Sequence, residues 1–389
     1  DITELASKVF FRYISTGTLW KMDDMFQLSI ELYDTKESKV IWSDRWEEKW
    51  DNLSTIKGNL SDGLLKALDT TSKVEKKVDS TNTEAYEYYL RGFYLFINRQ
   101  NKEDLNVSIE FLNKSIKLDN NLIKARHKLA FLHFAIGNVN QSYDIYNASL
   151  TKSEELEDKH AIGASKRGLS MIHSIRGEKE KQNECLEVAM NIFKEVDDKN
   201  LFAICHHDFG LFHTANGDYD KSINYFKRSI ELRHQVGKTI DVSIMAMAYP
   251  YYIKGEVDKS LNDLEEALKL FEDRKVKMRI STTCIYLAEI YLSKCDYNNA
   301  LKYSERAVKI TSEIGGSPLA QIMIYIYYFI SQKYLDIDYN KAKLHEIIEN
   351  NYIYSKNNKT SLYEDDFILP YRLYALLEET SYLETAYNL

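Results

Sequence analysis

Histidines recur at one fixed place in the middle of the chain. His133, His173 and His213 are separated by 40 residues each, and Tyr251 and Tyr291 take the same place further on. Imidazole is a common metal ligand, so three evenly spaced histidines raise the question of a metal centre. A shared ion would have to lie within roughly 2.1 Å of each nitrogen, whereas equivalent helices of stacked hairpins lie about 8 to 10 Å apart. We therefore expect these histidines to replace an aromatic packing residue, and we predict no metal site.

No other pattern has the context of a catalytic or cofactor site. The glycine-containing stretches GNVNQS (137–142) and GEKEKQ (177–182) lack the lysine and the preceding strand of a phosphate loop. The four cysteines show neither CxxC nor metal-finger spacing, which is typical of reduced residues in the cytoplasm. The sequence thus predicts no catalytic residue and no cofactor, and a chain that is not an enzyme.

Composition limits the classes of partner. A net charge of −8 argues against broad binding to nucleic acid or to acidic membranes, because both need a dominant basic surface. The longest apolar window, residues 322–330, is about half of the ~18 residues that a membrane span needs. We expect no signal peptide. With 3 prolines and 14 glycines in 389 residues, long helices are expected. The cysteine usage predicts a cytoplasmic location.

A helix-turn-helix pattern organises most of the chain. Its clearest copy is residues 203–230, where two runs of helix-spaced apolar residues flank the turn 216–218. The turn residue recurs at intervals of 40, 40, 38 and 40 residues, at Gly137, Gly177, Gly217, Gly255 and, with cysteine in place of glycine, Cys295. A small residue recurs five positions after most of these turns, and a second small residue recurs seven positions after that place. Helices that cross closely need small residues at the crossing, so stacked hairpins are predicted.

This pattern resembles the tetratricopeptide repeat (TPR), clearly over residues 84–307 and more weakly beyond. The resemblance implies a mainly α fold, a TPR-like right-handed α-solenoid of six to seven helical hairpins over residues 84–350, with a C-terminal helical cap at 351–389. The first pair is expected at 84–92 and 108–118, and the last at 320–334 and 339–350, before a polar break at 355–360. Pro250 lies inside a first helix and is expected to bend or break it there, which would splay Tyr249 and Tyr252.

A different pattern precedes the repeats. Alternating residues predict strands at 11–20, 26–33 and 40–46, after a short helix at the start of the chain. A helix is expected at 53–68. Residues 1–68 therefore form a small truncated α/β adaptor module, and the polar stretch 69–83 is expected to be a linker.

The adaptor carries a second resemblance. A glycine-containing turn at 15–17, the alternating strand 28–34 and the W-S-x-x-W motif at 42–46 are similar to a module of bacterial class III adenylate/guanylate cyclases and related regulators. There the module joins an N-terminal effector domain to a TPR array. The first βαβ half of the module is absent here, so we expect a fragment whose chain continues upstream into such a domain.

The first helices of the hairpins are expected to build the inner face of the solenoid. Basic candidates gather towards its N-terminal end, and aromatic residues and methionine towards its C-terminal end. Such a groove suits a protein or peptide ligand, although the same mixture also serves surface and packing. The candidate residues are Lys124, His127, Lys128, Phe131, Arg167, Met171, His207, Met245, Tyr249, Tyr252, Tyr286 and Glu289.

We therefore expect a non-catalytic interaction or regulatory region, a TPR scaffold, of a larger signalling protein. The resemblance implies an adenylate/guanylate cyclase as the parent. The alternative is the sensory or regulatory region of a winged-helix transcription regulator. The upstream sequence would separate the two, while a homo-oligomer stays compatible with both.

Overall fold

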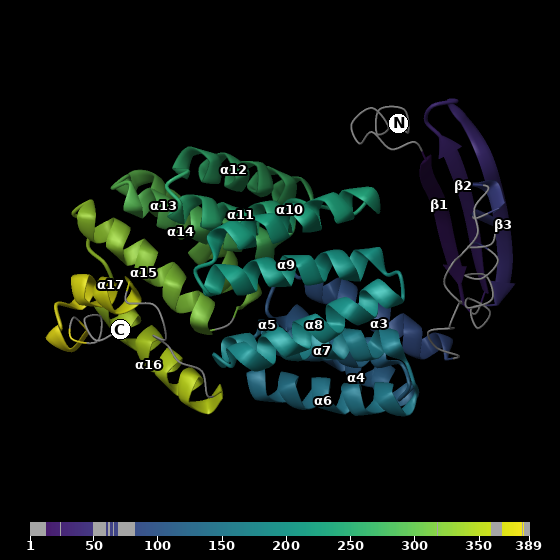
Figure 1. Ribbon diagram of the computed structural model, residues 1–389, viewed down its shortest axis with the longest axis horizontal. Helices are drawn as coiled ribbons and strands as arrows, with labels where there is room; N and C mark the ends of the chain where they lie inside the picture. The colour runs from purple at the N-terminus through teal and green to yellow at the C-terminus, as the bar shows by residue number, and fades with distance from the viewer. Residues whose placement is uncertain are drawn as a thin grey trace. The chain divides into compact units, whose positions relative to one another are not determined.

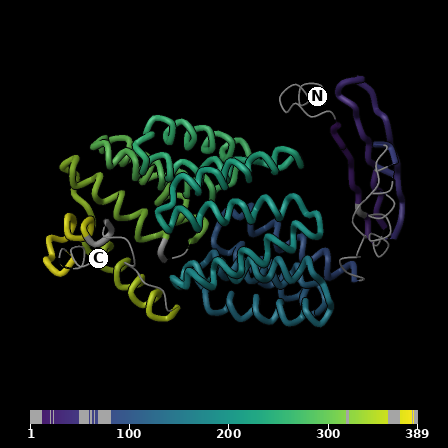
Figure 2. Tube along the Cα trace, in the orientation of Figure 1, coloured from purple at the N-terminus to yellow at the C-terminus, as the bar shows by residue number. Residues whose placement is uncertain are grey.

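The computed structural model describes residues 13–23, 25–49, 60, 63–64, 66–68, 82–316, 318–358, 368–382 and 384. The chain divides into two compact units, one of residues 1–90 with 114–122 and one of residues 91–113 with 123–389 (Figures 1 and 2). The domain boundaries predicted from the sequence stay predictions.

A three-stranded antiparallel sheet lies in the first unit, in the order β1-β2-β3. The strands are β1 (Tyr13–Met22), β2 (Met25–Asp34) and β3 (Lys39–Lys49). In the central strand Phe26 and Leu32 are buried, as the alternating pattern requires. The Asp34 carboxylate accepts hydrogen bonds from the amides of Lys36 and Glu37, at 2.9 and 3.2 Å, and so stabilises the turn into β3. The three predicted strands are confirmed.

Several predicted elements of this region are described in part or not at all. The initial helix, the first two residues of the first strand, and the linker up to residue 81 lie outside the described residues. Within the helix predicted at 53–68, the described residues 60, 63–64 and 66–67 are helical.

Seven consecutive helix pairs and one further helix make up the rest of the described chain. Their bounds are α3 (Thr83–Asn98), α4 (Glu103–Leu118), α5 (Ile123–Ala135), α6 (Val139–Glu155), α7 (Lys159–Ile175), α8 (Lys179–Glu195), α9 (Lys199–Ala215), α10 (Tyr219–Gln235), α11 (Asp241–Ile253), α12 (Val257–Asp273), α13 (Lys277–Ser293), α14 (Tyr297–Ile314), α15 (Pro318–Tyr334), α16 (Lys341–Asn358) and α17 (Ile368–Leu377). The predicted fold class, a TPR-like α-solenoid that follows a small sheet in the sequence, is confirmed.

The turns inside the hairpins lie where the sequence places them. All five turn residues have left-handed backbones, with φ of +92°, +69°, +77° and +82° at the four glycines and +57° at Cys295. At Gly217 the next amide, that of Asp218, donates to the carbonyl of His213 at 2.9 Å. This bond closes the end of α9, and a glycine serves it best because a Cβ is disfavoured at positive φ.

A second series of left-handed turns joins successive hairpins from α6 to α15, and sequence reasoning missed it. Its members recur at intervals of 40, 40, 38 and 40 residues, at Glu157, Asp197, Gly237, Lys275 and Gly315, with φ from +52° to +73°. Only two of the five are glycines, so no composition signal marks the series.

The small positions pack as predicted and also form hydrogen bonds. Ser142 donates to the carbonyl of Ala130 at 2.8 Å, and Ser260 donates to that of Ala248 at 2.7 Å, in each case from the second helix to the first. Ala267, on α12, is fully buried. The hydroxyl therefore adds a bond at a place where only a small side chain fits.

Two helices differ from the sequence expectation at one end. We expected the second helix of the first pair to begin at residue 108, yet α4 begins at Glu103. The cause is a local cap, because Asn101 Oδ1 accepts from the Asp104 amide at 2.9 Å while the Asp104 carboxylate accepts from the Gln100 amide at 2.7 Å.

The other difference is at α16, which runs through residue 350 and through the first part of the predicted break to Asn358. Here the cause is tertiary. Asn358 Oδ1 accepts from the amide of Val139 at 3.1 Å, and Asn140 donates to the carbonyl of Asn357 at 2.8 Å. These bonds hold the last turn of α16 against the start of α6.

Pro250 does not break α11, which continues to Ile253. The proline lies in the last turn, where the amide of Lys254 still bonds to its carbonyl at 3.1 Å. The rings of Tyr249 and Tyr252 have centroids 6.2 Å apart, so they are not splayed. The expected break is wrong, because the proline removes only its own amide bond to the preceding turn and the bonds after it keep the helix continuous.

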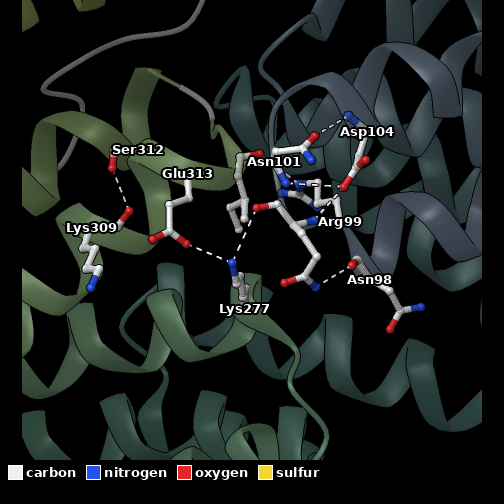
Figure 3. A network of polar contacts seen from close by, with 10 residues as sticks. Asn98, Arg99, Asn101, Asp104, Lys277, Lys309, Ser312 and Glu313 are labelled. Carbon is white, nitrogen blue, oxygen red and sulfur yellow. Dashed lines mark hydrogen bonds and ion pairs between the residues drawn. The ribbon is translucent and has the colours of Figure 1, made fainter.

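The helix pairs of the second unit return upon themselves. The segment after α3 meets the ends of α13 and α14, although more than 170 residues separate them (Figure 3). Arg99 is buried and donates from Nε to the carbonyl of Ile314 at 3.1 Å. Lys277 Nζ lies 2.9 Å from Glu313 Oε2 and donates to the Gln100 carbonyl at 3.4 Å. We call the contacts of residues 99–105 with Lys277 and residues 313–315 the clasp.

Candidate partner-binding face

The first helices of the hairpins contact one another through a ladder of polar side chains. His127 Nε2 on α5 is 2.7 Å from Ser165 Oγ on α7, and His207 Nδ1 on α9 is 3.1 Å from Ser243 Oγ on α11. On the next pair of helices Thr283 Oγ1 donates to Met245 Sδ at 3.3 Å. These three candidate residues hold neighbouring first helices together.

The two histidines of the ladder carry no charge at neutral pH. Burial is the main cause that lowers the pKa of His127 and of His207, each to about 3. Repulsion by lysine and arginine side chains lowers both pKa values further. They contribute hydrogen bonds to the inner face but no positive charge.

Arg167 is already paired inside the protein. Its Nε lies 2.5 Å from Asp208 Oδ2 and its Nη2 3.4 Å from Asp208 Oδ1, from α7 to α9. Both side chains are largely withdrawn from solvent, at 27% and 11% exposed. Sequence reasoning missed Asp208, and the only signal would have been its position one repeat and one residue after Arg167.

Lys128 pairs with no carboxylate in the part of the chain that the structure describes. Its Nζ lies 4.0 Å from the ring centroid of Phe93 on α3, a cation–π contact. Burial, then Arg167, then Lys124, lower the pKa of Lys128 to about 8. Lys128 therefore has two other positive side chains as its electrostatic neighbours.

The aromatic end of the face is partly covered by the C-terminal helix. Glu289 Oε1 lies 3.9 Å from Arg372 Nη2 of α17, and the Arg372 guanidinium lies 4.7 Å from the ring centroid of Tyr327. Burial raises the pKa of Tyr286, which lies half-buried on α13. Glu289 is therefore engaged by the protein itself.

A stripe of apolar side chains, one per hairpin, stays partly exposed along the first helices. Leu211 is 43% exposed and the other members are half-buried. The members follow the repeat interval, and we call them the apolar stripe: Phe131, Met171, Leu211 and Tyr249. Three of the four are candidates from the sequence, and their role in binding stays a prediction.

Sequence reasoning also missed two arginines. Arg233 stands near the end of α10, and its Nε donates to the carbonyl of Thr239 at 2.7 Å. Arg279 stands in the first turn of α13 and is half-buried. Arg233 lies on a second helix and Arg279 at the start of a first helix, whereas the candidates predicted from the sequence lie further along the first helices.

The evenly spaced histidines at the turns bind their own turn. The His133 and His213 rings have Nδ1 3.3 Å from Asn138 Nδ2 and from Asp218 Oδ2 respectively, and His173 contacts Glu178 in the same way. We expected these histidines to pack as aromatic residues do. Each also contacts the side chain of the residue that follows its turn glycine. Within the described ranges no group of three histidine, cysteine or acidic side chains is placed to hold a metal ion.

Comparisons with known proteins agree with the repeat architecture. A family model for the tetratricopeptide repeat matches residues 204–235, which include the turn at Gly217. Among curated proteins nothing matches this chain. No helix in the described part of the chain is long and apolar enough to cross a bilayer.

Several solved structures are similar in fold. A Rap protein complexed with Competence and Sporulation Factor is 15% identical, with 74% of this chain and 81% of that chain covered, at a TM-score of 0.47. RapI in its apo form is 13% identical, with 67% and 96% covered, at a TM-score of 0.46. BtubC from P. vanneervenii is 15% identical, with 57% and 93% covered, at a TM-score of 0.43.

Proposed function

We propose that this chain is a non-catalytic region that binds a protein or peptide segment through the inner face of its helical repeats. The apolar stripe carries the proposal, because it places one partly exposed apolar side chain on each of four successive hairpins. An extended or helical segment can meet such a row with apolar side chains at regular intervals. Apolar anchors in well-packed sites usually supply most of the binding energy.

Display of short random peptides against the purified chain tests this proposal. Selected peptides should lose about tenfold in affinity, or 1.4 kcal/mol, when Leu211→Ser or Tyr249→Ala is introduced. Lys227→Ala is the matched control, because Lys227 is exposed on the second helix α10. Peptides that bind all three variants as tightly as the native chain would place the binding surface elsewhere.

We further propose that the chain regulates an effector domain of the same polypeptide. The resemblance of the sheet region to the module of class III nucleotide cyclases supports a cyclase as the parent, and a winged-helix transcription regulator is the second candidate. The coding sequence upstream of residue 1 tests this. Paired metal-binding aspartates in a cyclase domain support the first candidate, and a basic recognition helix supports the second.

A further inference from the structure

Three carboxylates of the first helices have a basic partner within the protein. Asp208 on α9 pairs with Arg167, Glu289 on α13 with Arg372, and Asp241, at the start of α11, with Arg274. Each of these negative charges is thus offset by its own partner.

Three cations of the same region have no such carboxylate. Among the described residues, Lys128 contacts the Phe93 ring and no carboxylate, and the Arg233 side chain donates to a backbone carbonyl and pairs with no carboxylate. The side chain of Arg279 makes no hydrogen bond or ion pair with any residue that the structure describes, whereas its backbone is bonded to Val276 and Thr283. Although the whole chain has a net charge of −8, these three positive groups are left uncompensated.

The cations act on one another across the inner face. Arg279 on α13 lowers the pKa of His207 on α9, and α11 stands between these two helices in the order of the stack. Arg233 lowers the pKa of Arg279, and Arg167 lowers the pKa of Arg233. No carboxylate raises the pKa of Lys128, Arg233 or Arg279. The three cations thus lie among other positive groups in half-buried surroundings, where charges act more strongly than in water.

We propose that the inner face binds an acidic extended peptide segment, whose carboxylates are held by Lys128, Arg233 and Arg279 while its apolar residues contact the apolar stripe. This inference rests on the proposed binding function and adds the chemistry of the partner. An anionic segment offsets the repulsion among the three cations, and guanidinium groups bind carboxylates in a planar, bidentate geometry. An extended segment suits this face because the apolar stripe offers one side chain per hairpin at a regular interval.

The probe is a fluorescent peptide of eight glutamates, measured by anisotropy against the purified chain. We expect binding that weakens with added salt, and we expect Lys128→Gln or Arg279→Gln to weaken it by about tenfold each. The matched control is Arg228→Gln, because Arg228 is exposed on α10 and pairs with Glu231 on the same helix. Equal losses in the control and the two test variants, or no loss in either test variant, would overturn the proposal.

The pH dependence of the affinity for the glutamate peptide provides a second readout. The charged groups that face Lys128 are Lys124 on its own helix and Arg167 on α7, and the lysine has a pKa of about 8. It is charged below that pH and neutral above it, so affinity for the acidic peptide should fall between pH 7 and pH 9. Lys128→Gln should remove most of that fall, and an unchanged pH profile in this variant would contradict the assignment of Lys128.

Two further outcomes separate this inference from the function on which it rests. If neutral peptides bind in a manner sensitive to Leu211→Ser while the glutamate peptide does not bind, the binding function stands and the acidic partner is excluded. If tripolyphosphate binds with dependence on Arg279 and the glutamate peptide does not, the ligand is a phosphate compound and the proposal is overturned.

Discussion

At the scale of single residues, the inner face shows how one ion pair changes the meaning of a sequence pattern. Arg167 looks like a free cation in the sequence, yet Asp208 holds it at 2.5 Å. Burial raises the pKa of Asp208 and Arg167 opposes that rise, so the carboxylate depends on its partner to stay charged. A partner in solution therefore meets Lys128 and Arg279 rather than Arg167.

Removal of one member of this pair should destabilise the chain more than removal of both. We expect Arg167→Gln to cost about 3 kcal/mol, because it leaves a withdrawn carboxylate without a partner, and we expect less from Arg167→Gln combined with Asp208→Asn. Urea unfolding followed by circular dichroism measures both. Arg228→Gln, which breaks an exposed pair, should cost under about 1 kcal/mol. The coupling would be refuted if the double variant lost as much free energy of unfolding as Arg167→Gln and Asp208→Asn lose when their separate losses are added.

At the scale of elements, the hairpin is defined by its left-handed turn. Four copies use glycine, and the fifth uses Cys295 with φ of +57°. A side chain in that conformation costs roughly 1 to 2 kcal/mol. The copy with cysteine therefore has a less favourable turn than its neighbours.

Exchanges at two turns should change stability in opposite directions. Gly217→Ala should destabilise the chain by about 1 kcal/mol, because no atom lies within 4 Å of the new Cβ and only the backbone conformation opposes it. Cys295→Gly should stabilise by a similar amount, about 1 kcal/mol. Thermal unfolding of both variants measures the two changes. A lower melting temperature for Cys295→Gly would show that contacts of its thiol outweigh the backbone term.

At the scale of the whole repeat unit, the clasp joins segments that are far apart in the chain. Arg99 is 3% exposed and donates to the carbonyls of Phe96 and Ile314, at 2.9 and 3.1 Å. A guanidinium in such surroundings is stabilised only while both acceptors are in place. Its position makes it the residue on which the closure depends most.

Loss of the clasp should open the helix stack of this unit. We expect Arg99→Ala combined with Lys277→Ala to raise the radius of gyration in small-angle scattering and to speed hydrogen exchange at residues 313–316. Lys309→Ala is the control, since Lys309 is exposed near the clasp without forming part of it (Figure 3). An unchanged radius and unchanged exchange would mean that packing between neighbouring pairs alone keeps the unit closed.

The sequence by itself determined the hairpin interval, the turns inside the hairpins and the three strands. These features depend on residues close together in the chain. A turn glycine sets the backbone conformation of its own turn, and an alternating strand is recognised within a few residues. The same holds for the small packing positions, which repeat with the hairpins. The tertiary structure alone decided the features that join distant residues. It extended α16 to Asn358 through bonds to Val139, paired Arg167 with Asp208, and formed the clasp. It also decided which cations stay without a carboxylate, because that depends on where every neighbouring charge lies and not on the interval at which residues recur.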